Sequence, residues 1–141
     1  MDYWREFYYI NRMEIQLRKP EFIKINQIQP VQHCYHVYCK VVSANHSETV
    51  GFNGKAISVV EGVVADETGS ANFKLTGQNA KLIETGKVIA LRNGRSNIVD
   101  EHLILELDQF GRCTEENDVN MKAVNTEKNI SAALWERKKK Q

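Results

Sequence analysis

A short run near residue 35 holds the densest group of metal-ligating side chains in the sequence. It reads HCYHVYC, and its candidate ligands are His33, Cys34, His36 and Cys39. Thiolates and imidazoles are the side chains that commonly hold zinc, usually four around one ion. In an extended strand, however, the first and last of these residues point to one face and the middle two to the other. One ion could not collect all four, so we expect packed, inert residues and no metal.

The sequence carries no arrangement that predicts catalysis. Asp66 and Glu67 are adjacent, so their carboxyl groups diverge and make a poor acid–base pair. A nucleophilic cysteine needs a positioned base, and no sequence pattern supplies one. No glycine-rich phosphate loop is present. We expect a protein that is not an enzyme and needs no cofactor.

The charge balance argues against a dedicated nucleic-acid binder. Lys and Arg number 19 and Asp and Glu 18 in 141 residues, giving a net charge of +1. Within residues 19–113 the acidic and basic residues cancel, so the usual basic footprint is missing. A local basic groove can still coexist with an acidic back face.

Cysteine usage and hydropathy bear on the compartment. Three cysteines are an odd number and stand far apart, which favours a reducing, intracellular setting. No apolar run approaches the roughly 20 residues of a membrane span, so we expect no membrane partner.

Residues 19–113 form the body of the chain and have the pattern of strands. Turn-forming stretches separate the apolar runs, among them Asp66-Glu67-Thr68-Gly69. The predicted strands span 35–42, 57–65, 70–75, 87–92 and 102–107, with a short helix or turn over 78–84 and loops over 45–55 and 93–101. This is an all-β chain, and a short helix between the third and fourth of five strands is the order of an OB-fold barrel. The segmentation alone does not separate that barrel from other small barrels.

The two ends differ from the body. Residues 1–18 form an aromatic-rich N-terminal arm that includes Tyr3, Trp4, Phe7, Tyr8 and Tyr9. If this arm is helical, its apolar face needs a partner surface, because so short a helix is marginal alone. Residues 114–141 form a C-terminal extension with a possible strand or short helix over 129–135, followed by a basic terminus.

Several segments together carry a resemblance. They are 19–28 (KPEFIKINQI), 40–45 (KVVSAN), 66–69 (DETG), 91–94 (LRNG) and 111–112 (GR). Residues 19–135 resemble a eukaryotic family of small single-domain OB-fold proteins, in which the plant members are most similar. That family is related to the single-stranded-DNA-binding B subunits of the sensor-of-single-stranded-DNA complex and to the OB domains of replication protein A.

The resemblance implies a binding groove over the second and third barrel strands and the loops joining strands one to two and four to five. Bases stack there on aromatic rings, at about 1–3 kcal/mol per base. The places of those rings are held here by Thr76, Arg95, Val99 and Glu106, and Val99 is followed by Asp100-Glu101, which would repel phosphate. Phe73 is expected in the core by alternation. The remaining candidate binding residues are Lys40, Phe52, Lys55, Lys74, Arg92 and Arg95.

Two functions stay open at this point. The first is a weak or accessory module that binds single-stranded DNA or RNA, which would place the protein in the nucleus. The second is a structural subunit of a larger protein assembly, whose barrel has lost its stacking face and which docks through the aromatic arm.

Overall fold

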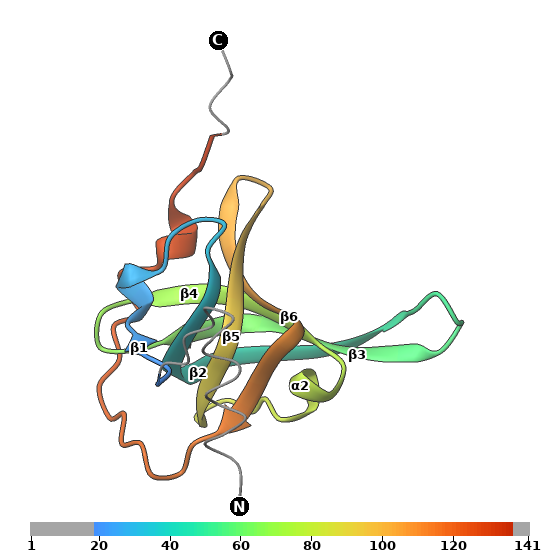
Figure 1. The fold of residues 1–141 in the computed structure, drawn as a ribbon, viewed down its shortest axis with the longest axis horizontal. Helices are drawn as coiled ribbons and strands as arrows, with labels where there is room; N and C mark the ends of the chain where they lie inside the picture. Colours follow the sequence, from blue (N-terminus) through green and yellow to red (C-terminus); the bar gives the residue numbers. More distant parts are fainter. Residues whose placement is uncertain (1–18, 137–141) are drawn as a thin grey trace, which may run out of the picture.

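The computed structural model describes residues 19–136, which fold around one barrel (Figure 1). The strands are β1 (Phe22–Ile23), β2 (His33–Val50), β3 (Ala56–Ala65), β4 (Ser70–Thr76), β5 (Val88–Val99) and β6 (His102–Glu115). Between them lie the 3-10 helix η1 (Ile25–Gln27) and the α-helix α2 (Gln78–Lys81), and the 3-10 helix η2 (Ile130–Ala132) follows.

The strand pairing closes the barrel. The order in the sheet is β1-β2-β3-β4-β6-β5, and a further pairing of β2 with β5 joins the two ends. The β4–β6 and β1–β2 pairings are parallel and the others antiparallel. Strands β2 to β6 thus form a five-stranded OB-fold barrel, with α2 between its third and fourth strands, and the predicted fold class is confirmed.

Alternation along the strands builds the core. In β2 the buried residues Val37, Cys39 and Val41 alternate with partly exposed ones, and β4 alternates as strictly. Phe73 is only 1% exposed, so its predicted core position is confirmed. Because a strand has a side-chain period of two, each buried set leaves a second set on the outer face. A ligand that binds to the surface of the barrel contacts this outer set.

The predicted loop over 45–55 is mostly strand. β2 and β3 stay paired from Lys40↔Ala65 out to Val50↔Ala56, which leaves only residues 51–55 as the turn. The resulting hairpin extends well beyond the barrel, at the right of Figure 1. From Asn45 to Val50 the side chains of β2 are exposed on both faces, so this half of the hairpin shows no apolar alternation in the sequence.

The predicted loop over 93–101 is also mostly strand. β5 and β6 pair up to Val99↔His102, and only Asp100 and Glu101 form the turn, with φ of 50° and 69°. Positive φ at both central residues is the backbone of a two-residue hairpin turn. Asn93-Gly94, which had suggested a loop, instead forms a bulge within β5. A Cβ at Gly94 would lie 2.7 Å from the Tyr35 ring.

Candidate nucleic-acid interface

One surface on the outer face of the barrel crosses all five strands and is hollowed over part of its length; we call it the groove. Its centre is a row of cross-strand neighbours, one from each barrel strand: Ser43, Val63, Asn72, Ile104 and Asn97. Opposite residues in paired strands point to the same face, so these five side chains form one surface. Ser43, Val63, Asn72 and Ile104 line a hollow of about 340 Å³, together with Asn45, Glu61, Gly62 and Phe73. The five side chains of the row carry no charge and two of them are amides, while Glu61 is the charged side chain in the lining of the hollow.

A second row on the same face carries paired charges. Glu61 of β3 stands opposite Lys74 of β4, with 3.6 Å between the carboxylate and the ammonium group. Arg95 of β5 stands opposite Glu106 of β6, and its guanidinium donates a 2.7 Å hydrogen bond to that carboxylate. This hydrogen bond raises the pKa of Arg95. Both predicted cations on this face therefore already have an acidic partner.

Arg92 lies on a different side of the barrel, among β1, β2 and β5. Its guanidinium carbon is 5.0 Å from the centre of the Phe22 ring, and its Nη2 is 3.5 Å from a Glu116 carboxylate oxygen. Phe22 in turn stacks on Tyr38, with ring centres 4.0 Å apart. Lys40 lies on β2, where that strand pairs with both β3 and β5, and it does not line the groove hollow.

Phe52 and Lys55 occupy the tip of the β2–β3 hairpin. Both are exposed, and Phe52 is as accessible as in an extended peptide. Phe52 is seven positions along the chain from Asn45 at the groove, which is about 23 Å at strand spacing. The six predicted binding residues are thus distributed over three places: Lys74 and Arg95 at the groove, Lys40 and Arg92 on β2 and β5, and Phe52 and Lys55 at the tip.

The HCYHVYC run does not alternate as a regular strand. Cys34 has a φ of 59°, and the β2–β5 register shifts between His33 and Tyr35. Cys39 is fully buried, and His36 accepts a hydrogen bond from the Asn93 backbone amide through Nδ1. Within residues 19–136, no three His, Cys, Asp or Glu side chains gather as metal ligands.

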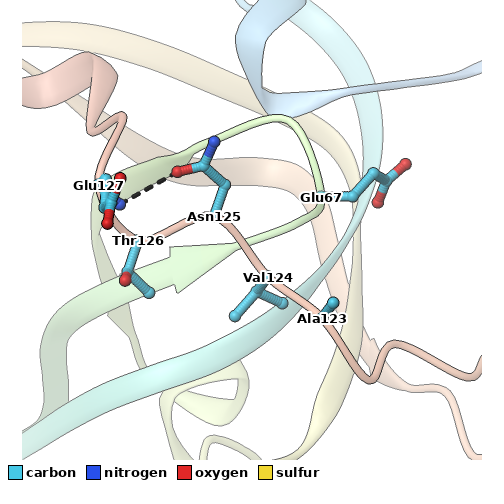
Figure 2. Close-up of a pocket in the computed structure, with 6 residues that line it drawn as sticks. All are labelled: Glu67, Ala123, Val124, Asn125, Thr126 and Glu127. Atoms are coloured by element: carbon cyan, nitrogen blue, oxygen red, sulfur yellow. Dashed lines mark hydrogen bonds between the residues drawn. The ribbon is translucent and has the colours of Figure 1, made fainter.

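The C-terminal segment borders the groove, which the sequence did not reveal. It passes the β3–β4 turn, where the Asn125 amide donates to the Asp66 carbonyl at 2.8 Å. Figure 2 shows the Asn125 side chain accepting a hydrogen bond from the Glu127 backbone amide, and both residues line a hollow together with Glu67. The segment then forms a single parallel bridge from Asn129 to Ser70 of β4. Of the strand or short helix predicted over 129–135, the structure has a short helix, the 3-10 helix η2.

Trp135 ends this segment beside the β5–β6 turn. Its backbone amide donates to the Glu101 carbonyl at 2.8 Å, and its side chain is 39% exposed. Together with Pro30, Val31, Asn97, Ile98 and Glu136, it lines a hollow of about 430 Å³. Only the contact between segments distant in sequence reveals this position, so no local pattern could have indicated it.

The comparison with known proteins now decides the family. The model of the family "Single-stranded DNA binding protein Ssb-like, OB fold" matches residues 28–115, which is more than half of the chain. The chain belongs to this family. The predicted resemblance to single-stranded-DNA-binding OB-fold proteins is thereby confirmed.

Relatives of this Ssb-like OB fold include a plant protein. An uncharacterized protein of Arabidopsis thaliana is 29% identical over 105 residues, covering 67% of this chain and 69% of that protein. The solution structure of a hypothetical protein from Arabidopsis thaliana has a TM-score of 0.72 at 23% identity, over 90% of this chain and 94% of the other.

An archaeal structure shares the fold at lower identity. The second OB-fold domain of replication protein A from Methanococcus maripaludis has a TM-score of 0.57 at 18% identity, over 71% of this chain and 99% of that domain. In this Ssb-like chain, no helix within residues 19–136 is long and apolar enough to cross a bilayer.

Proposed function

We propose that the protein is a weak or accessory single-stranded nucleic-acid-binding module, whose strand lies across the outer faces of β3, β4, β6 and β5. The observation that carries this proposal is the row from Ser43 to Asn97, one side chain from each barrel strand. The side-chain NH2 groups of Asn72 and Asn97 can donate to base edges, while their Oδ1 atoms already accept from Asn129 Nδ2 and the Ile98 backbone amide. It is a binding surface without a catalytic step or a cofactor, and a nuclear location follows if the strand is DNA.

The charges on this face support weak binding. Lys74 and Arg95 can neutralise phosphates only by sharing their charge with Glu61 and Glu106. Phe73 is the one aromatic among the described residues that line the groove hollow, and its ring is buried. Without rings at 1–3 kcal/mol per base, a single-stranded partner relies on hydrogen bonds and partly cancelled charge.

A titration of the full chain with labelled oligodeoxythymidine tests the proposal. The oligomer should exceed the roughly 4–16 nucleotides that one OB fold covers. We expect fluorescence anisotropy to give a dissociation constant in the micromolar range at low salt, weakening as salt rises. An oligoribouridine of equal length compares RNA with DNA. No binding of either oligomer at low salt would contradict the proposal.

A second candidate function is a structural subunit of a larger protein assembly. The observation that favours it is that Lys74, Arg92 and Arg95 are paired with carboxylates, so they are less available to phosphates than unpaired cations. A barrel that contacts other proteins does not need unpaired cations. The predicted partner-binding residues Tyr3, Trp4, Phe7, Tyr8 and Tyr9 lie outside the described residues. Under this proposal, replacing Trp4, Phe7 and Tyr8 by alanine abolishes co-sedimentation with a large complex and leaves the barrel's thermal unfolding midpoint unchanged. Unchanged co-sedimentation would contradict it.

A further inference from the structure

The hollow under Trp135 continues the groove at its β5 end. Asn97 belongs both to the central row of the groove and to the lining of this hollow. Ile98, which follows Asn97 on β5, also lines the hollow, as do Pro30 and Val31, which come before β2. The volume of about 430 Å³ is within the usual range of small-ligand sites, and the walls are largely apolar.

The tryptophan is held in place by the barrel rather than by its own short segment. Ser131, just upstream, is buried, and its hydroxyl accepts a 2.8 Å hydrogen bond from the Asn72 amide. Its carbonyl lies 2.6 Å from His102 Nδ1. Ser131 within η2 is bonded to β4, and Trp135 after it is bonded to Glu101, so the barrel holds the backbone that carries the indole before any ligand arrives.

We propose that Trp135 is a stacking platform for one unpaired base of a bound nucleic-acid strand, with Asn97 facing the base edge. The inference rests on the proposed function and names the end of the groove at which a ring is available. Trp135 is 39% exposed, so part of its flat apolar ring faces solvent and is available to a base. Because the C-terminal segment supplies this ring, a base can stack at the groove although no barrel strand in the part of the chain that the structure describes contributes an exposed ring to the groove hollow.

The surrounding charges select a base over a phosphate. Asp100 and Glu101 form the adjacent turn, and Glu136 lines the hollow itself. These carboxylates repel a phosphate, whereas a neutral base can enter and place its sugar-phosphate chain on the solvent side. Val31 lines the hollow and is 60% exposed, so a bound base would cover it in the same step.

Tryptophan fluorescence reports directly on this contact. The chain has two tryptophans, so Trp4→Phe leaves Trp135 as the only one. In this full-length variant, we expect oligodeoxythymidine to quench Trp135 emission over the same concentration range in which anisotropy shows binding.

Affinity measurements on matched variants complete the test. Trp135→Ala should weaken binding by roughly 5- to 150-fold, the equivalent of one stacked base, and Trp135→Phe by less. Leu134→Ala is the control, because this neighbour is 70% exposed and lacks a ring, and it should bind as the unaltered chain does. Circular dichroism melts verify that each variant is folded.

The two failures are distinguishable. If the oligomer binds but Trp135 emission stays constant and both Trp135 variants bind equally well, the platform is refuted and the groove stands. If, in addition to these results, an apolar peptide quenches Trp135 emission, the hollow is a protein-binding site instead. If the unaltered chain binds neither DNA nor RNA at low salt, the proposed function fails and the platform with it.

Discussion

Replacing Glu61 by glutamine should strengthen nucleic-acid binding, because Glu61 cancels a cation at the groove. Its carboxylate lies 3.6 Å from the Lys74 ammonium group, and both side chains are about half exposed. The substitution keeps the shape of the side chain and removes one negative charge. It also leaves Lys74 without its acidic cross-strand partner and so able to contact a phosphate.

The size of the effect follows from the geometry. A carboxylate about 7 Å from a phosphate repels it by about 0.6 kcal/mol in water, equivalent to roughly threefold in affinity. One further phosphate contact by Lys74 should steepen the salt dependence of binding to a single strand by about 0.7 in the log–log slope. An exposed ion pair is worth about 0–1 kcal/mol, so the free energy of unfolding should change little.

The assay is anisotropy titration with oligodeoxythymidine at several salt concentrations. Glu84→Gln is the control, since Glu84 is an exposed carboxylate that pairs with a lysine, Lys87, but does not line the groove hollow. We expect Glu61→Gln to bind about three- to tenfold more tightly at low salt and Glu84→Gln to match the unaltered chain. Equal affinity and equal slope for all three proteins would refute the placement of the strand over β3 and β4.

Three further predictions concern the barrel itself. Phe73→Ala removes a ring that is 1% exposed and should cost about 3–5 kcal/mol of unfolding free energy in a urea titration. Gly62→Ala would place a Cβ 2.0 Å from the Ser43 carbonyl oxygen, so we expect lower stability by roughly 1–3 kcal/mol or more; a melt equal to the parent's would contradict this. Burial raises the pKa of Cys113 to about 12 and raises that of Cys39 strongly, so both stay protonated at pH 8, and of these and the exposed Cys34 only Cys34 should react promptly with a thiol reagent; prompt reaction of two or three thiols would be the contrary result.

The barrel could be predicted because burial of its inner face produces an alternation of apolar and polar residues in the sequence. Val37, Cys39 and Val41 alternate with polar or partly exposed neighbours because only one face of β2 is buried over that stretch. From Asn45 to Val50 neither face of β2 is buried, although Val59 and Val60 opposite this stretch in β3 are, so this part of β2 cannot be told from a loop by its sequence. Hydrophobic periodicity reports burial rather than backbone conformation.

The groove could be predicted only in part. Lys74 and Arg95 were identified as surface cations, but their neutralisation by Glu61 and Glu106 depends on strand register across the barrel. Both pairs lie in hairpins, whose register is fixed by the turn. The pairing of Arg95 with Glu106 was hidden because residues 93–101 were predicted to be a loop, whereas they are mostly strand. Trp135 was missed for a related reason, since its place beside Glu101 depends on the path of a segment of irregular structure.

The C-terminal segment has a consequence for how this protein can be shortened. Its Lys128 carbonyl and Ser131 hydroxyl accept from the backbone amides of Ser70 and Asn72, at the margin of β4. β4 and β6 share only two register pairs, so this margin has little else to cover it. A fragment cut at residue 115, where the family match stops, would expose those amides as a bare sheet rim. Exposed sheet edges can pair with other chains, so we expect such a fragment to self-associate more than the longer chain does.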